Sequence, residues 1–280
     1  MIFGKFGCPK LGVIGAAIGT IASRIAMLIF IHYMMKNNKV LRPLIDNFSW
    51  KRVTKKMSYK IISLGIPSAF QMFFEVVLFT GAIWLCGRIG ASSQAANQIA
   101  LSLASVTFMF AMGLSVAAMI RIGHYKGLGD YIKLKKVATS IFILAMLFEI
   151  VFALLFLLCY QELPYLFLDS TNLSVNSNET EVLAIASQLL IIAALFQISD
   201  GLQVVVLGAL RGLQDVKLPT YITFISYWMV GFPISIYLGL FTDYKAKGVW
   251  IGLLAGLTVA AIFLLLRFYT LTNKLIKKTY

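Results

Sequence analysis

The sequence predicts an all-α membrane protein, a polytopic bundle of about seven transmembrane helices. Hydrophobic residues make up 60% of the 280 residues and charged residues only 13%, and the mean hydropathy is +0.86. A soluble domain, by comparison, carries about 25% charged residues. The apolar residues gather in runs long enough to span roughly 30 Å of hydrocarbon. No run alternates apolar and polar residues with a period of two, so helices are favoured over a β-barrel.

The apolar runs follow one another along the chain and are separated by polar connections. They lie at residues 12–34, 61–86, 92–119, 137–160, 183–210, 218–240 and 248–268. An α-helix rises 1.5 Å per residue. Each run is therefore long enough to cross the apolar layer once.

The charges of the connections predict the orientation of the chain. Basic residues concentrate in the stretch 36–60, after the third and fifth runs, and in the C-terminal tail, all on one side of the membrane. The loop 161–182, on the opposite side, contains no Lys or Arg. The positive-inside rule therefore places the stretch 36–60 and the C-terminus in the cytoplasm. This distribution accounts for the net charge of +14. We therefore expect the chain to contact the lipid bilayer and do not expect it to bind nucleic acid.

Two short cytoplasmic connections, 121–130 and 211–219, are expected to form tight turns. Each places a helix-ending Arg near Gly and Asp, as a turn at the end of a helix requires. No Walker motif, HExxH motif, nucleophile elbow or CxxC pair occurs in the chain. Cys8, Cys86 and Cys159 lie in or beside apolar runs without a metal-binding spacing. We therefore expect no enzymatic activity and no cofactor.

Four charged side chains fall well inside the expected spans: Arg24, Glu75, Glu149 and Asp200. A charge near the bilayer centre costs about 2.5–3.5 kcal/mol on insertion scales, so each of them needs an explanation. Glu75 shares a helical face with Gln71, and Asp200 shares one with Gln197 and Gln203. No polar stripe accompanies Glu149, and Arg24 follows Ser23 in a Gly- and Ala-rich helix without an acid of this chain to pair with. We expect structural roles for both.

A third polar stripe occurs in the run 92–119. Its members are Gln94, Asn97, Gln98, Ser102 and Ser105. These stripes predict either hydrogen bonds between helices, worth about 0.6 kcal/mol each, or a shared interior cavity. For the carboxylates a cation or proton site is favoured, because a buried carboxyl can exchange a proton and two carboxylates can hold Na⁺. For the Gln, Asn and Ser side chains both interpretations stay open.

Several segments resemble the multidrug and toxic compound extrusion (MATE) transporters. GIPSAFQMFFEVVLF, NQIALSLASVTFMFAMGLSVAAMIRIGHYKGLGD and FQISDGLQVVVLGALRGLQDVKLP resemble the C-terminal lobe of that family, and KLGVIGAAIGTIASR resembles its sixth helix. The resemblance implies one lobe of a two-lobe MATE-type transporter. It divides the chain into the last helix of the first lobe (1–35), a basic cytoplasmic inter-lobe linker (36–60), a six-helix C-terminal lobe (61–270) and a basic cytoplasmic tail (271–280).

The resemblance also implies a function. Such transporters exchange Na⁺ or H⁺ for small amphipathic, often cationic compounds, and Glu75 and Asp200 match the cation-site acids of the bacterial branch. The bacterial plasma (inner) membrane is then the expected location. Phe196 stands where some Na⁺-coupled members have Tyr, so H⁺ coupling stays open. The side chains expected to line the cavity are Gln71, Gln94, Gln98, Phe196, Gln197 and Gln203.

The resemblance leaves the first five helices of the family without a counterpart. We therefore expect a truncated chain, with the missing N-terminal lobe supplied by the same gene product or by another chain. One alternative is a non-transporting remnant, or a half-unit that requires another chain. A further alternative is a lipid-linked sugar flippase of the same superfamily. This is disfavoured, because such a cavity would be lined with Arg and Lys.

Overall fold

The computed structural model describes residues 12–38, 42–43, 54–167 and 177–279. The chain divides into two compact units, Met1–Lys60 and Ile61–Tyr280. Among the described residues, seven helical segments are long and apolar enough to cross a membrane, and no strand occurs. The prediction of a polytopic all-α membrane protein is confirmed.

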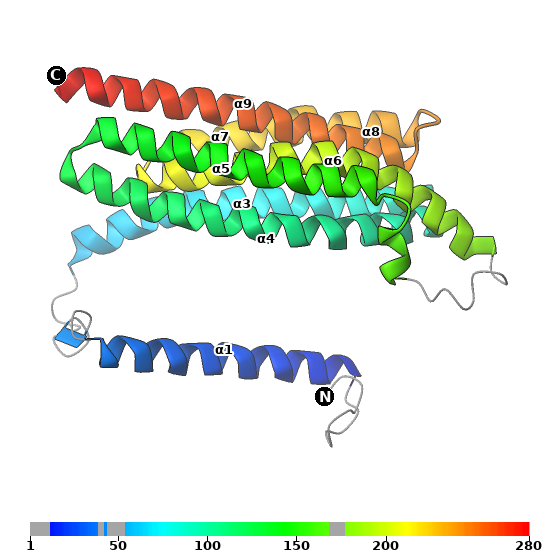
Figure 1. The fold of residues 1–280 in the computed structure, drawn as a ribbon, viewed down its shortest axis with the longest axis horizontal. Helices are drawn as coiled ribbons and strands as arrows, with labels where there is room; N and C mark the ends of the chain where they lie inside the picture. The colour runs from blue at the N-terminus through cyan, green and yellow to red at the C-terminus, as the bar shows by residue number, and fades with distance from the viewer. Residues whose placement is uncertain (1–11, 39–41, 44–53, 168–176, 280) are drawn as a thin grey trace. The chain divides into compact units, whose positions relative to one another are not determined.

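The helices are shown in chain order in Figure 1. The six long helices are α1 (Gly12–Asn37), α3 (Lys55–Ile89), α4 (Ala91–Leu128), α5 (Tyr131–Leu158), α6 (Ser177–Gly212) and α9 (Ala246–Thr279). The remaining span is composite: α7 (Lys217–Phe224), the π-helix η3 (Ile225–Gly231) and α8 (Phe232–Leu240) follow one another without a break. A short 3₁₀ helix, η2 (Leu163–Phe167), follows α5.

The helices extend beyond the apolar runs. α3 begins at Lys55, inside the predicted linker, and α9 continues to Thr279, through the predicted tail. α4 continues to Leu128, so the turn expected at 121–130 is limited to Gly129 and Asp130. Lys, Arg and Leu are good helix formers and no Pro interrupts these extensions, so a helix can continue past the apolar layer. The linker residues 39–41 and 44–53 lie outside the described residues.

Two residues make the turn between α4 and α5. Gly129 adopts the left-handed conformation, with φ of 73°, that ends α4. The Asp130 side chain accepts a hydrogen bond from the Lys133 backbone N–H at 3.0 Å and so caps α5. This bond and the nearby Lys133 ammonium hold the pKa of Asp130 below its usual value.

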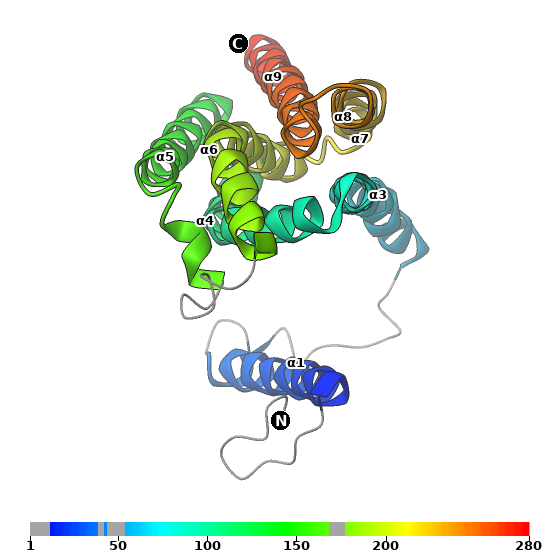
Figure 2. The ribbon, with the colours of Figure 1, turned by 90° about the vertical axis from the view of Figure 1, so that its right-hand side faces the viewer.

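α6 is the central helix of the second unit, because it packs against α4, α5 and α9 (Figure 2). Its contact with α4 is close. A Cβ placed on Gly208 would lie 2.9 Å from the Ser115 carbonyl carbon, and one on Gly212 would lie 2.6 Å from the Met119 oxygen. The Ser115 hydroxyl donates to the Val204 carbonyl at 2.7 Å. Small residues four apart let two helix backbones approach in this way.

A second glycine pair joins the composite span to α9. A Cβ on Gly252 would lie 2.6 Å from the Ser235 Cα, and one on Gly256 would lie 2.8 Å from the Gly231 Cα. The Ser235 hydroxyl donates to the Val249 carbonyl at 2.9 Å. Close backbone contact therefore fixes η3 and α8 on α9 just as it fixes α4 on α6.

Replacing Gly208 with Ala tests the α4–α6 contact. The added methyl meets backbone atoms of Ser115 that cannot rotate away, so Gly208→Ala should lower the free energy of unfolding by about 1–3 kcal/mol. The matched control is Gly113→Ala on α4, where a Cβ would meet no atom within 4 Å. The measurement is thermal unfolding of the detergent-purified protein. Equal melting temperatures for the two variants would contradict the close contact.

Candidate functional site

A cavity of about 270 Å³ lies between α3, α4 and α6, inside the second unit. Most of its wall is apolar, with Phe79 from α3, Phe108 from α4 and Val204 from α6. The ionisable side chains that reach the cavity are Glu75, Asp200 and Arg211. The structure thus brings both predicted acids into one largely apolar space, although they are far apart in the sequence.

The two carboxylates differ in their surroundings. Glu75 is half-buried on α3, whereas Asp200 on α6 is only 5% exposed. The Asp200 Oδ1 atom is buried and has no hydrogen-bond partner. The two groups lie near enough for their charges to interact. Two like charges in an apolar space are tolerated when a proton or a cation neutralises one of them.

Arg211 supplies a positive charge from within the protein. Its guanidinium, at the end of α6, lies within electrostatic range of Glu75. It does not form an ion pair with that acid. Instead its Nε and Nη2 donate to the Gln71 Oε1 atom at 3.2 and 3.0 Å. The Arg211 guanidinium therefore offsets part of the negative charge of the cavity, and its hydrogen bonds to Gln71 attach it to α3.

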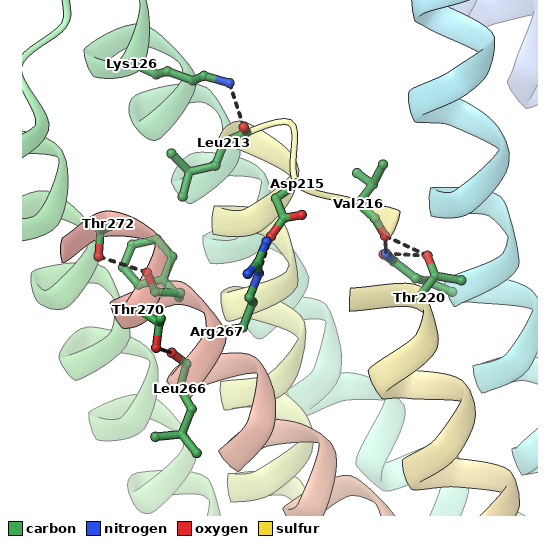
Figure 3. Close-up of polar contacts among 11 residues, drawn as sticks. Lys126, Leu213, Asp215, Val216, Thr220, Leu266, Arg267, Thr270 and Thr272 are labelled. Carbon is green, nitrogen blue, oxygen red and sulfur yellow. Dashed lines mark hydrogen bonds and ion pairs between the residues drawn. The ribbon is translucent and has the colours of Figure 1, made fainter. Parts of the chain in front are cut away.

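Gln71 extends these hydrogen bonds to the turn that follows α6. Its Nε2 atom donates to the Val216 carbonyl and to the Thr220 hydroxyl, both at 3.1 Å. The Thr220 hydroxyl in turn donates to the Val216 carbonyl at 2.7 Å (Figure 3). It also lies 3.0 Å from the Pro67 carbonyl. A continuous set of hydrogen bonds thus runs from the cavity to the α6–α7 turn.

Two more helices hold the same turn. The Lys126 ammonium of α4 donates to the Leu213 carbonyl at 2.6 Å, and the Arg267 guanidinium of α9 pairs with the Asp215 carboxylate at 2.7 Å (Figure 3). Gln214 adopts a positive φ of 58° in this turn. The turn that was predicted from the RGLQDVKLP segment is thus tied to α3, α4 and α9.

The other predicted cavity residues are distributed differently. Phe196 lines the cavity, is 2% exposed, and packs edge-on against Phe79 and Trp250. Gln197 and Gln203 are buried on α6 but do not line the cavity. Gln94, Gln98 and Gln71 do not line it either: the first two are exposed and Gln71 is 1% exposed beside the turn. That any of these glutamines lines a wider cavity between two lobes stays a prediction.

Sequence reasoning passed over two residues of this region. The sequence pattern places Arg211 only in the turn, yet its guanidinium reaches the cavity. Glu149 was assigned a structural role because no polar stripe accompanies it. It is 2% exposed, its charge interacts with that of Asp200, and its Oε2 atom has no hydrogen-bond partner. A Cβ on Gly201 would lie 2.6 Å from its carboxyl carbon. This contact crosses helices, so no local pattern could have revealed it.

Arg24 and Asn97 complete the set of polar residues singled out from the sequence. Arg24 is exposed on α1. Asn97, from the polar stripe of α4, is fully buried and accepts a hydrogen bond from the Trp250 Nε1 atom at 2.9 Å. In the part of the chain that the structure describes, no group of three or more His, Cys, Asp or Glu side chains is placed to hold a metal ion. A cation at Glu75 and Asp200 would therefore need neutral oxygen ligands as well.

Known proteins match this chain over nearly its whole length. A family model described as MatE matches residues 67–237. The probable multidrug resistance protein NorM of Agrobacterium fabrum is 34% identical over 278 residues, which cover 99% of this chain and 59% of that protein. The multidrug resistance protein NorM of Photobacterium profundum is 33% identical over 272 residues, which cover 95% of this chain and 57% of that protein.

Solved structures have the same fold. A multidrug resistance MATE family transporter of the MOP superfamily, in an outward-facing conformation, matches with a TM-score of 0.84 at 19% identity, over 99% of this chain and 59% of that one. The eukaryotic MATE transporter AtDTX14 matches with a TM-score of 0.80 at 22% identity, over 99% of this chain and 61% of that one. At these identities the likeness concerns the fold alone.

Seven helices long and apolar enough to cross a membrane, among the described residues, define the class of integral membrane proteins, and two carboxylates share one largely apolar cavity of this chain. The chain belongs to the MatE family, as its resemblance to MATE transporters predicted. It spans less than two thirds of the length of either NorM relative. Its matched segments include the C-terminal lobe and the turn at 211–219.

Replacing Gln71 with Ala tests the connection between the cavity and the turn. The change leaves the half-buried Arg211 donors and the Val216 carbonyl without this partner, which should lower the free energy of unfolding by about 1–3 kcal/mol. The measurement is thermal unfolding in detergent. Gln94→Ala is the matched control, because the Gln94 side chain is exposed. An equal loss of stability in both variants would show that the bonds of Gln71 do not hold the turn.

Proposed function

We propose that this chain forms the C-terminal lobe of a cation-coupled antiporter. The transporter would export small amphipathic, cationic drugs and toxic compounds across the bacterial plasma membrane. The coupling ion would be Na⁺ or H⁺, bound at Glu75 and Asp200. The observation that carries this proposal is the presence of both acids in one apolar cavity between α3, α4 and α6.

The charges of the cavity support ion binding rather than packing alone. Helices in a membrane can be joined by Gln or Ser at a lower cost than by ionisable acids, so a pair of interior acids favours a functional site. Arg211 lies near enough to act on Glu75 but is held by Gln71. An entering cation would therefore compete with a fixed internal charge. This competition gives the ion a means to change how α3 and α6 interact.

The size of the cavity supports a second lobe. Pockets for drug-sized ligands measure roughly 300–1,000 Å³, and this cavity measures about 270 Å³. This cavity therefore suits an ion and water, and we expect the drug to bind in a larger cavity between two lobes. The first lobe would come from the same gene product or from another chain. The C-terminus and the 211–219 turn would lie in the cytoplasm, following the basic residues.

Efflux of a fluorescent cationic dye tests the proposal. The chain would be joined behind the first five helices of the Agrobacterium fabrum NorM relative and expressed in cells that lack their own pumps. Glu75→Gln and Asp200→Asn should each reduce ion-driven efflux to background, because neither amide can carry the coupling charge. The matched control is Glu162→Gln, an exposed acid outside the spans, which should leave efflux unchanged.

The same experiment includes the outcomes that would contradict the proposal. Full efflux by both acid variants would make Glu75 and Asp200 structural. No efflux by the fused parent, despite its presence in the membrane, would favour a non-transporting remnant. Efflux by the 280-residue chain alone would mean that two copies assemble into a working unit. A lipid-linked sugar flippase is disfavoured, because the cavity carries two acids and a single Arg.

A further inference from the structure

A second, polar pocket of about 450 Å³ lies at the end of the second unit opposite the α6–α7 turn. The turns from α3 to α4 and from α8 to α9 meet the early part of α6 there (Figure 1). Pockets for small molecules measure roughly 300–1,000 Å³, so the space is sufficient for a ligand. Neither Glu75 nor Asp200 lines this pocket, which is therefore separate from the acidic cavity.

The first turn of α4 lines this pocket without a cap. Gly90 precedes the helix and has no side chain to offer to its backbone N–H groups. Within the described ranges, the N–H groups of Ala91, Ser92 and Ser93 donate no hydrogen bond. Unpaired N–H groups at the N-terminus of a helix, together with the helix dipole, attract anions such as phosphate. This end of α4 is therefore suited to an anionic group.

Ser93 is an independent sign that a ligand binds here. It is 6% exposed and lines the pocket, and its hydroxyl has no hydrogen-bond partner in the part of the chain that the structure describes. A buried group without a partner costs about 1–3 kcal/mol, and such groups usually mark an absent water or ligand. The neighbouring Ser92 hydroxyl donates to the Glu181 carboxylate at 2.7 Å, which joins the first turn of α4 to α6.

The charges around the pocket indicate a ligand that carries both signs. Lys245 and Lys247 flank the start of α9, Asp243 lies in the turn before it, and Glu181 lies on α6. These four side chains form no ion pair with one another, and their formal charges cancel. A phosphate alone would meet two carboxylates, and a cation alone would meet two ammonium groups. A molecule with both a phosphate and an ammonium satisfies both pairs.

The pocket lies where the apolar spans end. α3 ends at Ile89 and α9 begins at Ala246, and both residues line the pocket. Trp84, five residues before the end of α3, is 57% exposed, with the Arg88 guanidinium 5.6 Å from its ring centre. Tyr244 at the pocket is exposed as well. Exposed Trp and Tyr side chains are typical of the membrane–water interface, the level of the lipid head groups.

We propose that this pocket binds the phosphoethanolamine head group of a membrane phospholipid. The N–H groups of α4, the Ser93 hydroxyl and the two lysines, Lys245 and Lys247, receive the phosphate, while Glu181 and Asp243 receive the ammonium. The primary ammonium offers three N–H donors. A choline head group offers none, and a glycerol head group has no positive charge. The site lies outside the acidic cavity, so this inference does not rest on the proposed function.

Native mass spectrometry of the detergent-purified 280-residue chain tests the proposal. Phospholipids with identical acyl chains and with ethanolamine, choline or glycerol head groups would be titrated, and the lipid-bound fraction measured. We expect the ethanolamine lipid to bind about tenfold more tightly than either of the others, the equivalent of 1.4 kcal/mol. Equal affinities for the three lipids would overturn the proposal.

Two variants of opposite charge test the assignment of the pocket residues. Lys247→Gln should weaken the ethanolamine and the glycerol lipid alike, about tenfold, because both carry a phosphate. Asp243→Asn should weaken only the ethanolamine lipid, because only that lipid carries the ammonium. Parallel losses for both lipids in both variants would reveal a structural effect and overturn the assignment. The matched control is Lys136→Gln, an exposed lysine on α5 outside the pocket, which should bind as the parent does.

Soluble phosphorylethanolamine distinguishes a lipid from a free ligand. It has the same charged groups without acyl chains, so an excess should displace the bound lipid although its own affinity is lower. No displacement would mean that the acyl chains alone hold the lipid, which would overturn the head-group site. An affinity equal to that of the lipid would overturn the lipid as the ligand in favour of a free zwitterion. The melting temperature of each variant without lipid reports whether it is folded.

Discussion

The position of α6 inside the second unit is the constraint on which the other features of this lobe depend. A hydrocarbon layer cannot hydrogen-bond polar groups, so the polar residues of a membrane helix must face protein. α6 satisfies this condition because α4, α5 and α9 surround it, and Gly208 and Gly212 allow α4 to approach its backbone. This packing holds Asp200 at the cavity and Arg211 beside the α6–α7 turn.

The same helix joins the acidic cavity to the α6–α7 turn. Arg211 acts on Glu75 through its charge and on Gln71 through hydrogen bonds, while Gln71 also holds the turn that follows α6. Ion pairing between Asp215 and Arg267 adds α9 to this turn. A change of charge at the cavity therefore acts on the hydrogen bonds and the ion pair that connect α3, α6 with its following turn, and α9. In a coupled transporter, such a connection lets the binding of an ion alter the packing of a lobe.

Sequence patterns predicted the two acids of the site but not all of their neighbours. Glu75 and Asp200 were recognisable because an ionisable group inside an apolar run is costly and therefore conspicuous. Gln71 was expected beside Glu75 in the cavity, since they are four residues apart. In the structure, the Gln71 amide instead accepts a hydrogen bond from Arg211 and donates one to the Val216 carbonyl. Helical spacing indicates which residues share a face, but the neighbouring helix decides which of them meet a cavity and which meet a backbone.

The sequence by itself determined the class of this protein, the number of its spans and the identity of its costly charges, because the length and apolarity of a span and the cost of a buried charge are local properties. Its motifs also determined the family. Only the tertiary structure decided that Glu149 packs against Gly201 and that Tyr227 lies beside Gln203 and Asp200. These contacts join residues that are far apart in the sequence. They depend on where glycine lets two backbones approach and on which helices pack side by side, and neither follows from the periodicity of one helix.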